Sequence, residues 1–300
     1  MISVIICSIN KKFADQVQES IATSIGVTWE AIIIDNTLSP ESITRVYNIG
    51  AAKAQYNLLC FIHEDILFET KDWGKKLLTY FKEDVALGLI GVAGSKYKSK
   101  TPSGWFTGIT KLDCCNIMHL DKTGTQQKIY LNPLPETNIQ QVLVLDGVFL
   151  CCPKQVWQTI KFDDVLLTDF HLYDIDFSFR TAEKFKVIVS YDIDIIHVTK
   201  GAHYGDKWLE STLKWHKEMY KKLPVCIPEL TLDKKAFESN ILRTWLIRLK
   251  HENLSFFNKI NWLINIKIWK NIFAWPYVVL FLLKSILKNL QLKIKYKSKL

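Results

Sequence analysis

The chain has 300 residues with 48% hydrophobic content, enough for one large domain or two modest ones with a full core. Its formal net charge of +9 is concentrated near the end, because residues 241–300 hold 12 Lys and Arg residues and one acid, Glu252, whereas the first 240 residues hold 27 basic and 29 acidic ones. This distribution argues against a nucleic-acid-binding body.

The seven cysteines argue against a disulfide framework or a zinc site, because their number is odd and no CxxC pair occurs. The chain also opens directly on an apolar run, residues 2–8, without the basic leader or the cleavage site of a secretory signal. Both features predict a protein of the reducing cytoplasm.

The first 94 residues alternate between apolar, β-branched runs and segments with helical spacing. Strands are expected at residues 2–8, 30–35, 58–65 and 87–94, and helices at residues 11–25, 39–55 and 73–81. Pro40 and Glu41 mark the first turn of the second helix, and Thr70 is expected to cap the third. This alternation predicts a parallel α/β sheet with right-handed crossovers.

Residues 95–145 lose this periodicity, and we expect loops and a few antiparallel strands over the binding edge of the sheet. Regular patterns return at residue 146. A strand is expected at 146–152, helices at 170–185 and 208–220, and a pair of strands at 187–196.

The stretch Leu58–Phe68 (LLCFIHEDILF) places His63, Glu64 and Asp65 at the end of a buried strand. A parallel strand that ends in carboxylates presents them at the carboxyl edge of the sheet, where open α/β folds bind ligands. Two adjacent acids there suggest a hard divalent cation, and such a cation usually holds a phosphate. Taken alone, the stretch fits an ordinary strand end with solvated acids equally well.

Four segments in this order resemble family 2 glycosyltransferases of the GT-A fold, most closely bacterial members with a His-x-Asp metal motif. They are VIICS-x-N, IIIDN, FIHED, and DGVFL with FHLYDIDFSFR and IIHVTKG, and the resemblance covers roughly residues 1–222. It implies an α/β, Rossmann-like catalytic domain, residues 1–225, with a mixed, mostly parallel sheet and flanking helices, followed by a basic helical segment, residues 226–300.

The resemblance implies a nucleoside-diphosphate sugar as donor, preferably a UDP-sugar, held across the carboxyl edge of the sheet. Asp35 would accept hydrogen bonds from the base, with Ser8 and Asn10 in the same cleft, and Asn48 would be a donor-site Asn. The alternatives are a turn formed by Asp35 and Asn36, and a position of Asn48 on a helix surface.

The metal site implied by the resemblance consists of Asp65, in the family's Asp-x-Asp slot, and His197 at a strand end. Glu64 would face the ribose or reach the metal through water, and the role of His63, which departs from the family pattern, stays open. Oxygen ligands suit Mg²⁺ or Mn²⁺, and an imidazole ligand favours Mn²⁺. The alternative for His197 is a structural histidine.

The resemblance also implies a catalytic base, Asp174, in a slot where the family has two acids and this chain has Tyr173 before it. Asp176 remains a second candidate for the base, and it is otherwise expected to contact the sugar. The two aspartates point to different helix faces, so only one can face the sugar. For Asp176 the alternative is a helix N-terminal carboxylate that pairs with Arg180.

Asp146 and Gly147 begin the strand that resembles the family's acceptor-side segment. Trp105 and Trp208 could stack on sugar faces, with packing in the core as the alternative. A loop from Lys200 to His203 is expected to close over the diphosphate.

The uninterrupted apolar run near the end, residues 272–283, is shorter than the ~20 residues of a membrane-spanning helix. Because it is rich in aromatic residues and bounded by lysines, it is typical of an interfacial helix on an anionic membrane surface, broken or kinked at Pro276. The alternatives are a helical hairpin packed on the catalytic domain and a dimerisation element.

The sequence thus predicts a metal-dependent, inverting glycosyltransferase that acts on a glycan or lipid-linked acceptor in surface polysaccharide synthesis. We expect it in the cytoplasm, peripheral on the inner face of the membrane, with no nucleic-acid partner and with a homo-oligomer left open. One alternative is a sugar-phosphate nucleotidyltransferase, disfavoured because CSINKKF after the first strand lacks a glycine. The other is a non-catalytic protein that binds nucleotide sugars or forms a membrane scaffold.

Overall fold

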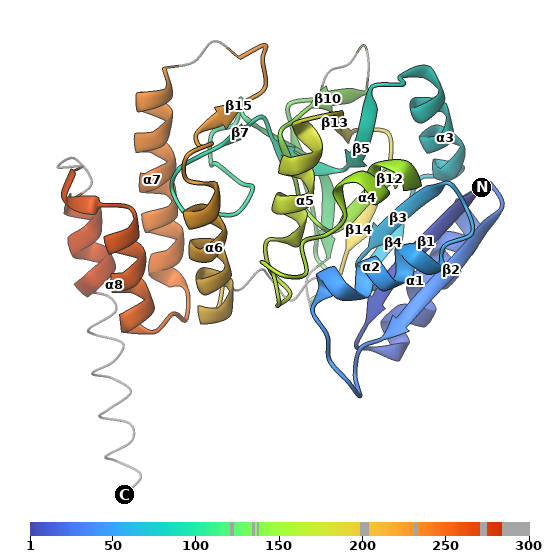
Figure 1. The fold of residues 1–300 in the computed structure, drawn as a ribbon, viewed down its shortest axis with the longest axis horizontal. Coiled ribbons are helices and arrows are strands. Elements are labelled where there is room, and N and C mark those ends of the chain that lie inside the picture. The colour runs from blue at the N-terminus through green and yellow to red at the C-terminus, as the bar shows by residue number, and fades with distance from the viewer. Residues whose placement is uncertain are drawn as a thin grey trace, which may run out of the picture.

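Apolar runs that the sequence predicts as strands form the central sheet in the computed structural model of the chain (Figure 1). The structure describes residues 1–120, 123–133, 136, 138–198, 204–230, 233–270 and 275–283. The central sheet has seven strands, in the spatial order β10 (Ile139–Gln141), β13 (Lys186–Ser190), β5 (Leu87–Gly91), β12 (Phe149–Pro153), β3 (Leu58–Ile62), β1 (Ile2–Ser8) and β2 (Trp29–Asp35).

The first three strands are parallel, as the sequence predicts, and Ser8 lies opposite Asp35 at their carboxyl edge. β12 lies between β3 and β5 and runs antiparallel to both. The sheet is therefore mixed, and β5 is not the neighbour of β3 that a simple alternation of strands and helices predicts. Because β12 runs in the opposite direction, its first residue, Phe149, pairs with Ile62, the last residue of β3.

A second sheet lies beside the first and receives the chain at the end of β3. Its strands are, in order, β11 (Val144–Leu145), β6 (Ala93–Ser95), β8 (Asp113–Leu120), β14 (Ile195–His197) and β4 (Ile66–Phe68), with β9 (Gln126–Leu131) paired to β8. The antiparallel strands predicted within residues 95–145 are confirmed by the pairs β6–β8 and β8–β9. A short third sheet pairs β7 (Tyr97–Lys98) with β15 (Val225–Cys226).

The stretch Leu58–Phe68 is two strands rather than one. The chain leaves the central sheet at Ile62 and enters the second sheet at Ile66. The antiparallel pairing of β14 with β4 places His197 opposite Ile66. The turn that carries residues 63–65 therefore lies at the junction of the two sheets, beside the end of β14.

The helices of the described residues cover the sheets and form one end of the molecule. They are α1 (Lys11–Ser24), α2 (Ile43–Lys53), α3 (Trp73–Glu83), α4 (Lys154–Ile160), α5 (Tyr173–Ala182), α6 (Asp206–Met219), α7 (Lys234–His251) and α8 (Phe256–Asn265), followed by a 3₁₀ turn (Ile268–Lys270). Residues 275–283 are also helical.

One predicted helix start and one predicted helix cap are wrong. α2 begins after Ser42, whose hydroxyl accepts a backbone N–H and caps the helix, so Pro40 lies in the preceding loop. Thr70 does not cap α3, because its hydroxyl oxygen accepts the backbone N–H of Asp194 at 2.8 Å. α2 thus starts later than predicted, whereas α3 begins at Trp73 as predicted although Thr70 is engaged by another segment.

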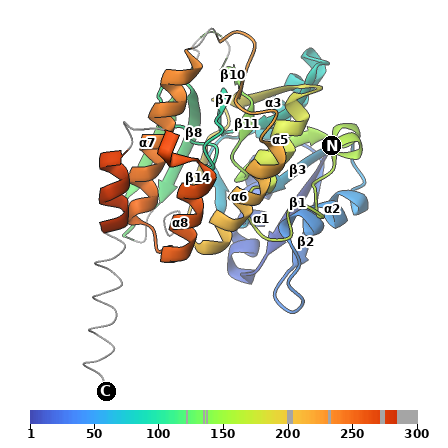
Figure 2. The ribbon, with the colours of Figure 1, turned by 60° about the vertical axis from the view of Figure 1, so that its left-hand side comes forward.

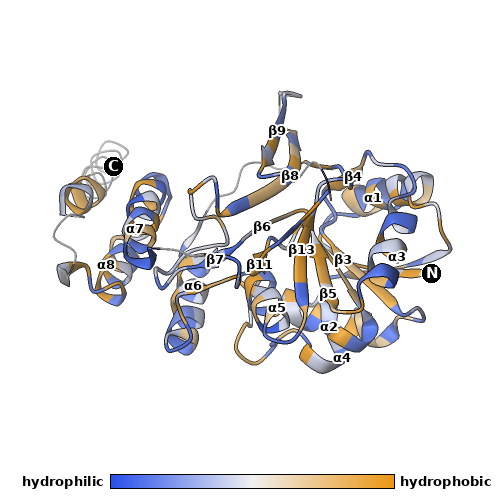
Figure 3. Cartoon of the chain, turned by 90° about the horizontal axis from the view of Figure 1, so that it is seen from above, coloured by the Kyte–Doolittle hydropathy of each residue, from blue (hydrophilic) through white to orange (hydrophobic). Residues whose placement is uncertain are grey.

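The alternation of side chains along β1 separates two hydrophobic cores. Val4 and Ile6 pack with α1 and α3 on one face, whereas Ile5 packs with α2, α4 and α5 on the other. Figure 3 shows the central strands in largely hydrophobic colours between helices of mixed colour. The sheet is thus buried on both faces, which leaves its carboxyl edge for ligands.

The C-terminal helices gather at one end of the molecule (Figures 1 and 2). They share a third core with α5 and α6, which includes Trp215, Trp245 and Trp262. Two of these indoles donate hydrogen bonds to the loop between β7 and β8, Trp245 to the carbonyl of Phe106 at 3.0 Å and Trp262 to that of Pro102 at 2.9 Å. Within the described residues, no helix combines the length and the apolar character needed to cross a membrane.

Candidate active site

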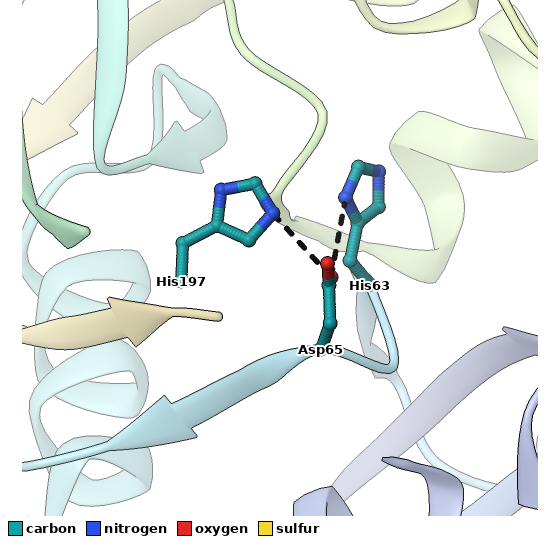
Figure 4. Close-up of side chains that lie close together, drawn as sticks. All are labelled: His63, Asp65 and His197. Atoms are coloured by element: carbon teal, nitrogen blue, oxygen red, sulfur yellow. Dashed lines mark ion pairs between the residues drawn. The ribbon is translucent and has the colours of Figure 1, made fainter. Parts of the chain in front are cut away.

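Three side chains able to ligate a metal meet where the two sheets join (Figure 4). Oδ1 of Asp65 lies 3.4 Å from Nε2 of His197 and 3.9 Å from Nδ1 of His63. One ligand atom from each residue lies within 4.8 Å of the other two. The side chains of His63, Asp65 and His197 keep 20%, 27% and 18% of their exposure, so a ligand can reach them. We call these three residues the metal group.

The backbone holds the metal group in place from both sides. His63 donates its backbone N–H to the carbonyl of Val148 at 3.2 Å, and Val198 donates to the carbonyl of Asp65 at 2.8 Å. The structure thus brings the predicted ligands Asp65 and His197 together and adds His63, whose role the sequence leaves open.

A tyrosine fixes the tautomer of His63. Nε2 of His63 lies 2.7 Å from the hydroxyl of Tyr173, which lies 3.1 Å from the carbonyl oxygen of Gly147. The carbonyl can only accept, so the hydroxyl proton goes to Gly147 and Nε2 donates its own proton to Tyr173. The lone pair of neutral His63 is then on Nδ1, the nitrogen that faces Asp65.

The electrostatics of the metal group favour a charged carboxylate and a neutral His63. Burial and then the charge of His197 lower the pKa of His63. Burial acts to raise the pKa of Asp65, but the hydrogen bond with His197 and the charges of both histidines lower it overall. Burial acts to lower the pKa of His197, and its hydrogen bond to Asp65 raises it overall. One carboxylate oxygen and two imidazole nitrogens form a donor set that fits a divalent ion such as Mn²⁺.

Glu64 ties the metal group to the loop after β1. Its Oε2 accepts hydrogen bonds from the hydroxyl of Ser8 at 2.7 Å and from the backbone N–H of Asn10 at 3.1 Å. The side chain of Asn10 accepts the backbone N–H of Lys12 and caps α1. The structure therefore brings Ser8, Asn10 and Glu64 together, beside the metal group.

A cavity of about 920 Å³ opens in front of the metal group. Its size is in the range of small-molecule sites. The metal group and Glu64 line it, together with Asn10, Phe13, Asn36, Arg45, Phe170 and Lys207. Phe170 lies outside α5, is 53% exposed, and has its ring centroid 5.7 Å from that of His63. An exposed aromatic ring at the mouth of a polar cavity offers a face for a sugar or a base.

Asp35 lies beside this cavity rather than on its wall. It shares a smaller hollow of about 480 Å³ with Ser8 and Asn10, whereas its neighbour Asn36 lines the large cavity. Thr37 donates its hydroxyl and its backbone N–H to the carboxylate of Asp35, at 2.6 and 2.9 Å, and these bonds lower the pKa of Asp35.

Asn48, a predicted donor residue, makes its side-chain hydrogen bonds elsewhere. Its Oδ1 accepts the indole N–H of Trp157 at 3.0 Å and the backbone N–H of Phe162 at 3.1 Å, and its Nδ2 donates to the carbonyl of Phe162 at 2.9 Å. These bonds join α2 to α4 and the loop after it, away from the metal group.

Two carboxylates, Asp146 and Asp174, are connected to the metal group: the charge of Asp146 acts on His63 and His197, and Asp174 follows Tyr173, which contacts His63. Asp174 is in the first turn of α5, and its Oδ2 accepts the backbone N–H of Gly147 at 2.9 Å. Burial, and then the charge of Asp146, raise the pKa of Asp174 to about 7. Oδ2 of Asp146 accepts the indole N–H of Trp105 at 2.6 Å. The structure thus brings together the predicted residues Trp105, Asp146, Gly147 and Asp174.

Gly147 is required by the close approach of the turn before β12 to α5. A Cβ on Gly147 would lie 2.1 Å from the hydroxyl oxygen of Tyr173 and 3.0 Å from Cβ of Asp174. A larger residue would displace both side chains.

Two predicted residues lie away from the site. Asp176 is 1% exposed, and its carboxylate accepts from Nε of Arg180 at 2.8 Å and from the indole of Trp215 at 3.0 Å. The pairing with Arg180 is the alternative that the sequence offers. Trp208 is 7% exposed and stacks on Trp245, with ring centroids 5.4 Å apart, so it lies in the core. The predicted loop from Lys200 to His203 lies outside the described residues.

The sequence alone misses two residues of the site, Tyr173 as the partner of His63 and Phe170 at the mouth of the cavity. Both belong to the FHLYDIDFSFR segment, so the segment itself is a signal. Nothing in the spacing shows that Tyr173 reaches His63, because the two residues are 110 positions apart.

A central mixed α/β sheet with flanking helices is the architecture of GT-A glycosyltransferases. Residues 3–221 match the family described as "Glycosyltransferase like family". The chain belongs to this family of glycosyltransferases, as its sequence motifs predict. No curated protein matches the chain.

Solved structures show the same fold. The chain is similar to S. aureus TarS, residues 1–349, with a TM-score of 0.52 and 11% identity, over 84% of this chain and 75% of that one. The same TarS segment in complex with UDP gives a TM-score of 0.49 and 12% identity, over 84% and 72%. GalNAc-T7 with UDP, GalNAc and Mn²⁺ gives 0.48 and 10%, over 66% of this chain and only 43% of that one. At such low identity, the TarS match at 0.52 shows a shared fold alone.

Proposed function

We propose that the chain is a metal-dependent, inverting glycosyltransferase that moves a sugar from a nucleoside-diphosphate donor, preferably a UDP-sugar, to a hydroxyl of a glycan or lipid-linked acceptor. The observation that carries the proposal is the position of the metal group on the wall of a cavity of about 920 Å³, where His63 contacts Tyr173, the residue before Asp174, whose pKa is raised to about 7. We call the metal group with this cavity the donor side, and the set Trp105, Asp146, Gly147 and Asp174 the acceptor side.

On the donor side, Asp65, His63 and His197 would hold the ion, and Glu64 and Asn36 would contact the nucleotide. The ion supplies positive charge for the departing nucleoside diphosphate. Tyr173 keeps Nδ1 of His63 free of its proton, as the hydrogen bonds around it require.

On the acceptor side, Asp174 takes the proton of the attacking hydroxyl. A base is most effective when its pKa lies near the working pH, and the pKa of Asp174 is raised to about 7. Asp146, held by the indole of Trp105, would accept a hydrogen bond from a hydroxyl of the sugar or the acceptor. Asp176 has no part in this step, because Arg180 and Trp215 occupy its carboxylate.

Residues 226–300 have a separate role in this proposal, which is contact with the inner face of the cytoplasmic membrane during surface polysaccharide synthesis. Exposed apolar side chains support it, among them Phe257 at 77%, Trp269 at 56% and Leu280 at 54%. Residues 241–300, which contain these side chains, hold 12 Lys and Arg residues and one acid. Apolar groups combined with positive charge bind anionic bilayers. Co-sedimentation with phosphatidylglycerol vesicles, and not with phosphatidylcholine vesicles, is the expected result.

The donor half of the proposal is tested by thermal unfolding with nucleoside diphosphates, with and without Mn²⁺. Stabilisation grows with the ratio of ligand concentration to Kd. We expect a rise in Tm with UDP only when Mn²⁺ is present, and transfer from a UDP-sugar under the same conditions. A shift with UDP that is the same in EDTA would contradict the metal-dependent mechanism. A rise in Tm with another nucleoside diphosphate, and not with UDP, would mean that the donor carries that nucleotide instead.

A further inference from the structure

Arg248 of α7 is held by aromatic rings rather than by an acid. Its guanidinium carbon lies 4.9 Å from the ring centroid of Tyr204, 5.1 Å from that of Phe106 and 5.4 Å from that of Trp245. Such cation–π contacts fix a guanidinium by its face. Among the described residues, none forms an ion pair with Arg248 or accepts a hydrogen bond from it. The five N–H donors of its fork are therefore directed to a ligand or to solvent.

The surroundings of Arg248 are rigid. The buried Lys98 donates to the carbonyls of Ser103 and Gly104 at 2.8 and 2.9 Å, which anchors the loop that leads to Phe106. The indole of Trp245 holds the carbonyl of Phe106 itself at 3.0 Å. A positive charge that is fixed before a ligand arrives binds without the cost of ordering a side chain.

A chain of contacts connects Arg248 to the acceptor side. Phe106 follows Trp105, with ring centroids 5.7 Å apart, and Trp105 donates to Asp146. Burial raises the pKa of Tyr204 to about 12, and the charges of Arg248, Asp146, Glu252 and Asp174 all act on its hydroxyl. Arg248 thus lies on the flank of the acceptor side, near enough to bind a group attached to the acceptor sugar.

We propose that Arg248 binds a phosphate ester carried by the acceptor, next to the sugar that receives the transfer. The planar fork of a guanidinium matches two oxygens of a phosphate, and its face is already occupied by the three rings. The choice of phosphate rests on the proposed function, because a lipid-linked acceptor carries a phosphate beside its sugar. The ester belongs either to a soluble glycan phosphate or to a lipid headgroup, and the chemistry at Arg248 is the same.

The test is a calorimetric titration of glycerol 3-phosphate into the full chain in EDTA, so that the donor side and its ion take no part. Arg248→Gln should weaken binding roughly ten- to hundred-fold, the effect of losing hydrogen bonds to a charged group. Arg248→Lys keeps the charge and loses the fork, so it should weaken binding less. Arg243→Gln is the matched control, because Arg243 is on the same helix and contacts Tyr277, over its ring at 4.8 Å and through a hydrogen bond to its hydroxyl.

Two results would overturn the phosphate site: equal binding by the wild type and both Arg248 variants, or tighter binding of gluconate than of glycerol 3-phosphate. Absence of Arg248-dependent binding both to glycerol 3-phosphate and to phosphatidylglycerol vesicles, while UDP with Mn²⁺ still raises Tm, would overturn this site and leave the glycosyltransferase proposal intact. A missing UDP and Mn²⁺ shift in the wild type would instead contradict the proposed function.

A vesicle arm distinguishes the two sources of phosphate. Loss of binding to phosphatidylglycerol vesicles in Arg248→Gln, without binding of the soluble ester by the wild type, supports the site and assigns it to a lipid headgroup. Binding of the soluble ester that depends on Arg248 supports the site and assigns it to the glycan.

Discussion

On the donor side, polar residues lie at strand ends and the register of the sheets places them, whereas on the acceptor side they come from loops and helices far apart in the chain. Asp65 and His197 meet because β14 pairs with β4. Trp105, Asp146 and Asp174 meet through side-chain hydrogen bonds that span 27 and 41 positions. A site that strand register places tolerates variation in the loops, whereas a site assembled from loops and helices depends on each hydrogen bond.

The largest expected effect is the loss of the metal group. Asp65→Asn removes the charged ligand, so transfer should fall by about 10³-fold or more, because several kcal/mol of charge stabilisation are lost. The Mn²⁺-dependent rise in Tm with UDP should disappear as well. Asp15→Asn, at a surface carboxylate paired with Lys11, is the control. An Asp65→Asn protein that keeps its Mn²⁺ dependence would show that the donor side is placed elsewhere.

Next in size is the loss of the base. Asp174→Asn should lower kcat by about 10²–10³-fold and leave the UDP and Mn²⁺ shift in place. In the wild type, kcat should rise with pH through about 7, because Asp174 must be deprotonated to accept a proton. Asp176→Asn should keep this rise of kcat with pH, but it should lower the free energy of unfolding, since Arg180 loses its partner. If instead Asp176→Asn abolishes the rise of kcat with pH, Asp176 and not Asp174 is the base.

Asp174→Asn, which lowers kcat, is expected to raise stability at high pH. The pKa of Asp174 is raised in the folded protein, so its ionisation costs stability as pH rises from the unfolded value of 3.8 toward the folded value of about 7. Asp174→Asn should therefore raise Tm at pH 8 and not at pH 3.5. A fall in Tm at pH 8 would mean that a loss of activity reflects damage to the fold.

A smaller effect is expected at the contact between the two sides. Tyr173→Phe frees Nε2 of His63, so the tautomer is no longer fixed and Mn²⁺ affinity should fall roughly ten- to hundred-fold. Calorimetric titration of Mn²⁺ without donor measures this. Tyr97→Phe is the control, because it removes another buried hydroxyl, one that donates to Glu238 at 2.9 Å. Equal losses in both variants would indicate packing rather than the tautomer.

The smallest effect on transfer is expected at Asn48. Asn48→Ala leaves the N–H groups of Trp157 and Phe162 without their acceptor, so the free energy of unfolding should fall by about 1–3 kcal/mol. The KM for the donor should stay unchanged. A raised KM for the donor at an unchanged free energy of unfolding, measured with urea, would show that Asn48 contacts the donor.

The sequence predicts the fold and the donor side to the extent that they follow strand patterns. Strands β1 and β2 are visible as apolar runs, and the residues at their ends, Ser8 and Asp35, are visible with them. His197 is visible because it too ends a strand. The insertion of β12 between β3 and β5 is not visible, since nothing local distinguishes a parallel from an antiparallel neighbour.

Contacts between distant segments account for what the sequence leaves open or places elsewhere. Asn48 is bound by residues more than 100 positions away, so its helix pattern gives no sign of its partners. Trp208 fits a sugar-stacking residue and a core residue equally well until Trp245 is seen to cover it. Asp176 is the exception, because its partner Arg180 is one helical turn away and the sequence shows the pair.

The direction of β12 has a consequence for how such a protein can diversify. Because this strand enters the edge from its amino end, Asp146 and Gly147 belong to the chain that arrives from residues 92–145, not to the strands that build the donor side. Exchange of the loop between β7 and β8 alone, which carries Trp105, would present a different surface beside Asp146, while β8 stays paired with β14 beside His197. Under the proposed function, acceptors can therefore change through one loop while the strands that place the metal group stay the same.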